Sequence, residues 1–290
     1  DTFTTAVGPA SLVSDAVVTA VETSRDWQRI AIPGTAPLRY RDDIVTDVTK
    51  TSDITYRTAP NRSGASVTLK LDVYEPAGDA VTSRPAIVWV HGGGFSSGNK
   101  RSPEIVDEAT TFAKRGFVNI SIDYRLEPEG CSAAAPTGAC IDAIKEAMDD
   151  AQAAVRWVRS HASEYSIDTT RIAIGGSSAG AITALNVGYQ SSEDAASSVR
   201  AALSLSGANL LGHISAGDPP ALLLHGTSDA TVPYDWAGNT VRDARAAGDL
   251  TVLTSWQGAG HVPYAQFHDQ ILREETQFLW WMLDLGAAAR

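Results

Sequence analysis

The chain has 290 residues, of which 43% are hydrophobic and 20% charged, as expected for an ordinary globular protein built as one large α/β domain. Its 34 acidic and 23 basic residues leave a net charge of −11, which argues against nucleic acid or an anionic membrane as a partner. No apolar run approaches the roughly 20 residues that a membrane span requires.

Residues 1–50 have the least regular sequence pattern of the chain, so their secondary structure is the hardest to predict. The chain begins at Asp1 rather than at methionine, so we expect a processed mature form or a trimmed chain. Residues 16–21 could form a helical turn or a strand, whereas the prolines of residues 32–37 predict a loop. Because there is no repeat or internal linker, we expect one domain over residues 1–290, with residues 1–50 as its N-terminal extension.

From residue 53 onward the pattern is regular. Residues 54–57 and 67–74 alternate as half-exposed strands, and the turn between them predicts an antiparallel pair. Continuously apolar runs, which are typical of parallel strands covered on both faces, follow at 86–90, 118–122, 171–174, 202–205, 221–224 and 250–253. Helical stretches separate them at 103–115, 141–161, 179–189, 235–247 and 264–285. The pattern predicts an α/β fold of about eight strands, two antiparallel and six parallel, with helices on both faces.

Cys131 and Cys140 are the only cysteines. Two cysteines alone cannot make a structural zinc site, and they do not have the C-x-x-C spacing. The alternatives are two free thiols or a local disulfide, which would contribute roughly 2–3 kcal/mol in the chain-entropy model. We expect the disulfide, and because such bonds persist in oxidising compartments, we expect a secreted protein.

A strand–turn–helix segment around residue 178 carries the first chemical motif. Gly176, Ser178 and Gly180 match G-x-S-x-G, the pattern of a nucleophile elbow. Glycine suits this turn because the serine backbone is strained and the flanking positions leave no room for a Cβ. Ser177 would need glycine at position 179, where the chain has alanine, so Ser178 is the candidate nucleophile.

A nucleophilic serine needs a general base and a carboxylate to orient that base. In this type of fold the acid and then the histidine follow the serine, each after a strand end. His261 directly follows the last predicted strand and is the candidate base, and Asp229 follows the preceding strand and is the candidate acid. The alternatives to these two are His268, Asp218 and Asp235. We interpret His225 as a structural residue that shapes the turn before Asp229.

Three consecutive glycines at positions 92–94 follow the predicted strand 86–90, between His91 and Phe95. Without side chains, this backbone can turn its N–H groups toward a developing oxyanion. We therefore predict an oxyanion hole formed by the N–H groups of Gly93, Gly94 and Ala179. A phosphate loop is the competing interpretation, but the lysine that it requires is absent, and a dinucleotide-binding glycine pattern fails as well.

Together these motifs resemble the α/β-hydrolases of the carboxylesterase/lipase class. The resemblance covers about residues 53–285, and it is nearest to the hormone-sensitive-lipase-like and the feruloyl- or acetyl-xylan-esterase-like bacterial enzymes. Residues 123–126, Asp-Tyr-Arg-Leu, are similar to a segment that is mainly structural in that family. The chain departs from the family pattern directly afterwards, in the segment that holds both cysteines, so the resemblance leaves the substrate open.

The motifs predict a serine carboxylic-ester hydrolase that forms an acyl-enzyme and uses no metal or cofactor. A peptidase or amidase on the same scaffold, or a catalytically silent binding protein, are the alternatives. The resemblance implies that lidded members carry a helical cap after the strand following the nucleophile helix, where this chain has only residues 207–220. We therefore predict a shallow cleft, partly covered at most by residues 1–50, that suits short-chain or polymer-linked esters. The residues predicted to line it are Phe95, Trp236 and Tyr264. The oligomeric state is left open.

Overall fold

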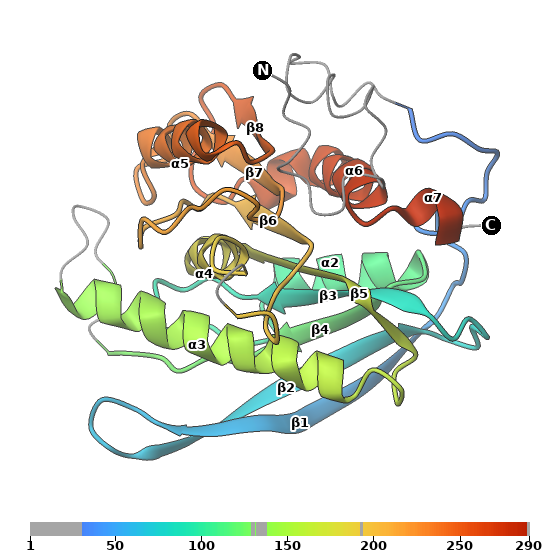
Figure 1. Ribbon diagram of the computed structural model, residues 1–290, viewed down its shortest axis with the longest axis horizontal. Coiled ribbons are helices and arrows are strands. Elements are labelled where there is room, and N and C mark those ends of the chain that lie inside the picture. The colour runs from blue at the N-terminus through green and yellow to red at the C-terminus, as the bar shows by residue number, and fades with distance from the viewer. Residues whose placement is uncertain (1–30, 129–130, 132–137, 192–193, 289–290) are drawn as a thin grey trace.

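One eight-stranded sheet runs through the molecule, with helices on both of its faces (Figure 1). The computed structural model describes residues 31–128, 131, 138–191 and 194–288. Its strands are β1 (Val48–Pro60), β2 (Ser66–Pro76), β3 (Arg84–Val90), β4 (Val118–Ile122), β5 (Ile167–Ser177), β6 (Ala201–Leu205), β7 (Ala221–Gly226) and β8 (Thr251–Trp256). Its helices are α2 (Pro103–Lys114), α3 (Gly138–Ser160), α4 (Ala179–Gly188), α5 (Tyr234–Ala247), α6 (Tyr264–Met282) and α7 (Leu285–Ala288).

The strand order is β1-β2-β4-β3-β5-β6-β7-β8. β1 pairs with β2, and β2 with β4, in antiparallel fashion, whereas the six strands from β4 to β8 pair in parallel. Every residue of β3, β4, β6 and β7 is buried, as their continuous apolar runs predict. β1 is mostly exposed because it forms the edge of the sheet.

Each face of the sheet has its own hydrophobic cluster. Residues of α3, α4 and α5 share one cluster, and residues of α2, α6 and α7 share the other. The predicted fold class is therefore confirmed, including the absence of a large inserted cap, since residues 206–220 are all described and contain no helix or strand. The prediction for residues 16–21 lies outside the described residues. β1 and β5 are longer than expected. β1 adds mostly exposed residues at both ends, whereas β5 adds the buried Gly175, Gly176 and Ser177 on the side of the elbow.

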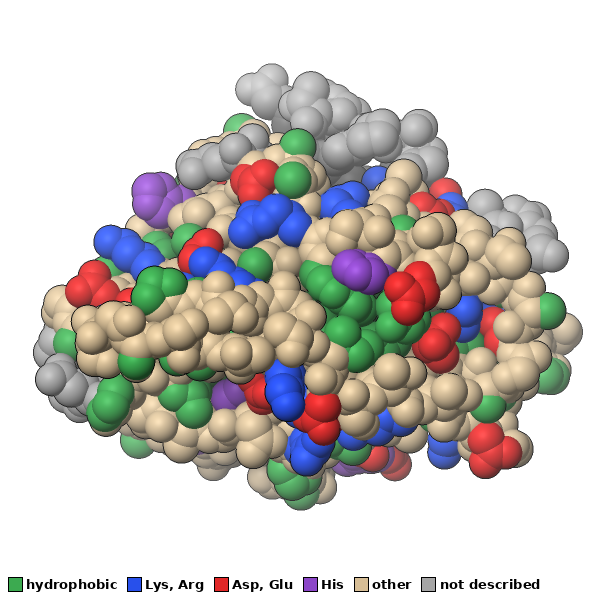
Figure 2. Space-filling view, turned by 90° about the horizontal axis from the view of Figure 1, so that it is seen from below, with side chains coloured by type: hydrophobic (Ala, Val, Ile, Leu, Met, Phe, Trp, Pro, Cys, Tyr) green, Lys and Arg blue, Asp and Glu red, His purple; other side chains and the backbone are tan. Residues whose placement is uncertain are grey.

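The surface agrees with the mixed charge of the sequence. On the face shown in Figure 2, Lys and Arg side chains lie among Asp and Glu side chains rather than in one continuous basic patch. In the described part of the chain, none of the helices has the length and apolar character needed to cross a membrane.

Several carboxyl groups are buried between α2 and α6. Glu108 and Glu275 are each 2% exposed, and one carboxyl oxygen of each has no hydrogen-bond partner among the described residues. Burial raises the pKa of Glu275 to about 8, although the nearby Arg115 lowers it and Glu274 raises it further. Burial and the proximity of Glu275 also raise the pKa of Glu108. Both side chains therefore favour the neutral, protonated form in the folded protein.

This burial makes stability depend on pH. The folded protein holds a proton on Glu275 that the unfolded chain releases above its ordinary pKa of 4.5, so stability falls as the pH rises from about 4.5 to about 8. Glu275→Gln removes the ionisable group, and we expect it to stabilise the fold by about 1–3 kcal/mol at pH 8.5 and by much less at pH 5. Urea unfolding at both pH values measures this difference. The exposed Asp243→Asn serves as a control, and an equal effect of Glu275→Gln at both pH values would contradict the prediction.

Candidate active site

The nucleophile elbow joins β5 to α4. Ser178 has φ 54° and ψ −118°, a backbone conformation that residues with a Cβ seldom adopt, and α4 begins at the next residue. A Cβ on Gly176 would lie 2.4 Å from the carbonyl oxygen of Val90, and a Cβ on Gly180 would lie 1.9 Å from the same oxygen. Only glycine fits at either position, so the motif allows β3 to approach the turn closely. The partly exposed Ser178 side chain is thereby placed at the carboxyl edge of the sheet.

Ser178, His261 and Asp229 form a continuous hydrogen-bonded relay. The Ser178 Oγ lies 2.8 Å from His261 Nε2, and His261 Nδ1 lies 2.8 Å from Asp229 Oδ2. Because a carboxylate only accepts hydrogen bonds, Nδ1 carries the imidazole proton and Nε2 is free to accept the proton of the Ser178 hydroxyl. The other carboxyl oxygen, Asp229 Oδ1, accepts the N–H groups of Thr231 and Val232 at 2.9 and 3.0 Å.

The alternative acids and base lie elsewhere. His268 is on α6 and its Nε2 lies 2.7 Å from Asp107. Asp218 accepts the N–H of Ser215 in the loop before β7, and Asp235 lies in the first turn of α5. None of these side chains contributes to the relay around Ser178.

The glycine loop after β3 leaves two of its N–H groups without an acceptor among the described residues. The Gly92 carbonyl accepts a hydrogen bond from His91 Nδ1 at 2.6 Å, and the Gly93 carbonyl accepts the N–H groups of Ser96 and Ser97, both at 3.1 Å. Since the C=O and N–H of a trans peptide point in opposite directions, the N–H groups of Gly93 and Gly94 point away from these partners. Neither they nor the N–H of Ala179, at the start of α4, has an acceptor among the described residues.

Two cavities meet at Ser178. The smaller has a volume of about 50 Å³ and is lined by Gly94, Phe95, Cys131, Cys140, Ser178, Ala179, Ile182, Leu210, Thr231, Val232 and Trp236. The larger is an open cleft of about 470 Å³, lined by Gly92, Gly93, Gly94, Ser97, Gly98, Ser102, Glu104, Ser177, Ser178, Thr231, His261 and Val262. Side chains of the first are mainly apolar, and those of the second are mainly polar. No three His, Cys, Asp or Glu side chains in the described part of the chain are grouped so that they could hold a metal ion.

Of the three residues predicted to line the cleft, two lie beside Ser178 and one lies elsewhere. Phe95 and Trp236 border the small cavity, whereas Tyr264 borders neither cavity. The Tyr264 hydroxyl instead donates a hydrogen bond of 2.7 Å to Asp107, because the first turn of α6 packs toward α2. The expectation that Tyr264 lines the cleft is therefore corrected. The predicted disulfide between Cys131 and Cys140 is confirmed, and it forms part of the wall of the small cavity.

Comparisons with known proteins agree with this geometry. The BD-FAE family model matches residues 71–209, which include the glycine loop and the elbow. The TAP-like protein family model matches residues 192–279, which include Asp229 and His261. Esterase 2 of Thermogutta terrifontis, in a structure phosphorylated by paraoxon, is 27% identical, with a TM-score of 0.67 over 80% of this chain and 93% of that chain. This chain belongs to the α/β-hydrolase carboxylesterase family.

A second structure of that esterase and one curated relative extend the comparison. The propionate-bound structure of the same Thermogutta terrifontis esterase is 27% identical, with a TM-score of 0.64 over 78% of this chain and 92% of that chain. The carboxylesterase NlhH of Mycobacterium tuberculosis is 38% identical over 96 residues, or 33% of this chain. The chain spans only about a quarter (26%) of the length of NlhH.

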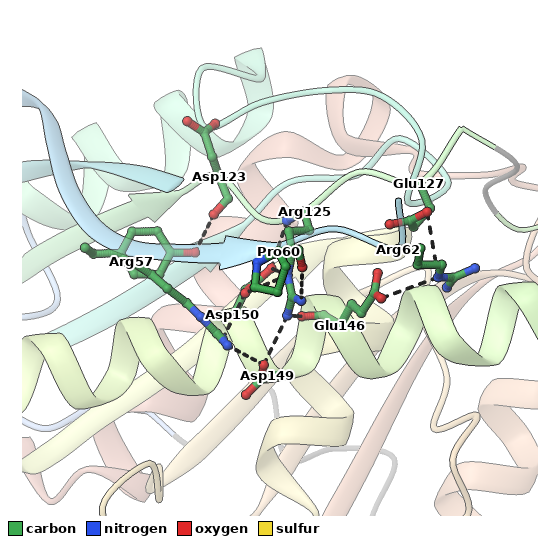
Figure 3. Close-up of polar contacts among 10 residues, drawn as sticks. Arg57, Pro60, Arg62, Asp123, Arg125, Glu127, Glu146, Asp149 and Asp150 are labelled. Atoms are coloured by element: carbon green, nitrogen blue, oxygen red, sulfur yellow. Dashed lines mark hydrogen bonds and ion pairs between the residues drawn. The ribbon is translucent and has the colours of Figure 1, made fainter. Parts of the chain in front are cut away.

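A charged network connects the segment after β4 to α3 and to the end of β1 (Figure 3). Arg125, in the segment after β4, points toward α3 and binds Asp150 at 2.9 Å and Asp149 at 3.0 Å, and it also donates to the carbonyl of Pro60 at the end of β1. The same segment reaches the site two residues later, where the Glu127 N–H donates to the Phe95 carbonyl at 2.8 Å. The network therefore connects the Asp-Tyr-Arg-Leu segment to the wall of the small cavity.

Sequence reasoning missed two supporting residues. The sequence indicates that His225 shapes the turn, but the structure also places its Nε2 3.2 Å from Asp229 Oδ2, the oxygen that His261 binds, and 2.9 Å from the Val232 carbonyl. Ser206, at the end of β6, accepts the N–H of Val262 at 3.0 Å and so holds the loop that carries His261. The position of His225 directly before Gly226 at a strand end is the only signal that could have indicated its role.

The environment of Asp229 favours the carboxylate. Burial raises its pKa, but hydrogen bonds from His225, His261 and the Val232 N–H outweigh burial and hold the pKa of Asp229 well below its ordinary range. His225 is itself completely buried, so its contact with Asp229 is shielded from water. His225 and His261 thus approach the same carboxyl oxygen from two sides.

Because the His261 imidazole lies on the Ser178 hydroxyl, we expect paraoxon to phosphorylate Ser178, and we expect His225→Phe to slow this reaction. A hydrogen bond to a charged group contributes about 1.5–3 kcal/mol, so the rate should fall roughly 10- to 100-fold. His225→Gln keeps an N–H donor, so its rate of modification should fall less than that of the Phe variant. The second-order rate of modification, followed by intact mass, measures the effect, and urea unfolding of each variant separates it from a loss of folding. A well-folded Phe variant that reacts at the wild-type rate would show that His225 only shapes the turn.

Proposed function

We propose that this chain is a serine carboxylesterase that hydrolyses esters through Ser178, His261 and Asp229. The observation that carries the proposal is the relay of two 2.8 Å contacts that ends on a serine in a strained elbow. A buried carboxylate, an imidazole with its free nitrogen on the serine, and unpartnered N–H groups nearby are the parts that acyl transfer requires.

In this mechanism the Ser178 Oγ attacks the ester carbonyl carbon while His261 Nε2 takes the hydroxyl proton. Asp229 orients the imidazole and stabilises its positive charge. The N–H groups of Gly93, Gly94 and Ala179 stabilise the tetrahedral oxyanion. His261 then returns the proton to the leaving alcohol, and water, activated in the same way, releases the acid from the acyl-enzyme.

The two cavities supply places for the two halves of an ester. Because His261 must give its proton to the leaving oxygen, the alcohol half belongs in the cleft that His261 lines. The acyl half then occupies the other cavity, which Phe95, Ile182 and Trp236 line together with the disulfide. Its small volume supports acyl groups of a few carbons, and the open cleft accommodates alcohols of many sizes, including groups on a polymer.

The relatives support this assignment, since NlhH is named a carboxylesterase and Thermogutta terrifontis esterase 2 was solved with propionate bound. We propose short-chain esters, such as acetyl or propionyl esters, as the substrate class, with polymer-linked esters as further members. Secretion is part of the same proposal, because the Cys131–Cys140 disulfide suits an oxidising compartment.

Ser178→Ala is expected to reduce hydrolysis of 4-nitrophenyl acetate by several orders of magnitude, because it removes the nucleophile. Ser177→Ala is the matched control at the adjacent position and should keep substantial activity, since the Ser177 hydroxyl donates to Glu104 rather than to His261. Circular dichroism of both variants checks folding. Equal losses in the two folded variants would contradict the choice of Ser178, and faster hydrolysis of a 4-nitroanilide than of the ester would indicate an amidase.

The size of the small cavity predicts a dependence on acyl length. In a series of 4-nitrophenyl esters, kcat/KM should be highest for the two- to four-carbon acyl groups and fall by roughly tenfold or more at eight carbons, because added methylene groups overfill a packed cavity. Trp236→Ala enlarges that cavity and should move the optimum to longer chains. A wild-type preference for long-chain triglycerides with activation at an oil–water interface would contradict both the small acyl site and the open cleft.

A further inference from the structure

The cleft proposed for the alcohol half of the substrate has a single acidic side chain among the described residues that line it. Apart from His261, Glu104 is the only ionisable residue among the described residues that line it. The other side chains of the lining are hydroxyl groups, with Val262 as the one aliphatic exception. The small cavity on the acyl side has no charged side chain among its described lining residues. Charge therefore distinguishes the two sides of Ser178.

Glu104 is held in this position by two features. It lies in the first turn of α2, where the helix N-terminus favours a negative side chain. Its Oε1 accepts a hydrogen bond of 2.9 Å from the Ser177 hydroxyl, and Ser177 directly precedes the proposed nucleophile. This hydrogen bond fixes the carboxylate beside the elbow and uses only one of its two oxygens. Glu104 remains half-buried, so a ligand in the cleft can approach the second oxygen.

We propose that Glu104 makes the alcohol side of the site selective for esters of cationic alcohols over esters of anionic alcohols. This inference rests on the proposed esterase function, because that function assigns the alcohol half to the cleft. A fixed carboxylate attracts an ammonium group on the alcohol and repels a carboxylate or sulfonate group. The net charge of −11 acts in the same direction during the approach of the substrate.

Three acetate esters of similar shape isolate the effect of charge. They are acetylcholine, which is cationic; 3,3-dimethylbutyl acetate, which is neutral; and 2-sulfoethyl acetate, which is anionic. Measuring kcat/KM for each by pH-stat titration at low salt, relative to its alkaline hydrolysis rate, removes differences in chemical reactivity. In a water-exposed site one charge at contact distance changes a rate about fivefold, so the wild type should prefer the cationic over the anionic ester by roughly 10- to 25-fold.

Glu104→Gln keeps the size and the hydrogen bond of the side chain but removes its charge, and the cation-to-anion ratio should fall at least threefold. Glu104→Asp keeps the charge and should retain most of the preference. Asp243→Asn makes the same charge change on α5, on a residue that lines neither cavity, and should leave the ratio unchanged. In the wild type, 0.5 M NaCl should reduce the ratio, because screening weakens the attraction at an open site.

The outcomes separate this inference from the function on which it rests. Hydrolysis of the neutral ester by the wild type, together with the same charge ratio in Glu104→Gln and the wild type, would overturn the role of Glu104 and leave the esterase function intact. If 0.5 M NaCl does not change the wild-type ratio of kcat/KM for the cationic ester to that for the anionic ester, the role of Glu104 is also overturned. This holds even if the Gln variant fails to fold. Failure of the wild type to hydrolyse any of the three esters would overturn the esterase function and the inference together.

Discussion

The site depends on the contact between the end of β3 and the turn after β5. Val90 pairs with Gly176 across the two strands, and the Val90 carbonyl oxygen occupies the space that a Cβ at Gly176 or Gly180 would need. A larger residue at either position would force the strands apart. Because the glycine loop continues directly from Val90 and Ser178 lies between the two glycines, this single contact sets the distance between the predicted oxyanion donors and the nucleophile.

Asp229 and His261, the other two residues of the site, follow β7 and β8, which are the last two strands in the order of the sheet. β7 and β8 pair in parallel, so the loops that carry Asp229 and His261 leave the same edge as the elbow. Hydrogen bonds between these loops and β6 then set their final positions. The Ser228 N–H donates to the Ala259 carbonyl at 2.9 Å, and Ser206 accepts the N–H of Val262. The hydrogen-bonded arrangement of Ser178, His261 and Asp229 is thus assembled from three strand ends that a rigid parallel sheet keeps at fixed separations.

Electrostatics has different roles on the two sides of this framework. Around Asp229, buried donors stabilise a negative charge where water is excluded, so each hydrogen bond to this carboxylate is stronger than it would be in water. Around Arg125, paired charges connect the hairpin of β1 and β2 to α3 and stabilise the wall of the small cavity at a distance. Glu104 lies where the cleft is open to solvent, and its charge acts on what enters the cleft rather than on the fold.

Sequence patterns were enough to predict the fold class, the candidates Ser178, Asp229 and His261, and the disulfide between Cys131 and Cys140. These follow from local patterns, because apolar runs, strand-end motifs and a short cysteine spacing act within a few residues of one another. The sequence could not show which of the expected lining residues reach the cavities, because this depends on how α6 packs against α2, and in the folded protein Tyr264 binds Asp107 instead. The tertiary structure also decides the contact of His225 with Asp229 and the direction of Glu104, since both depend on how separate elements pack together and no local pattern encodes such packing.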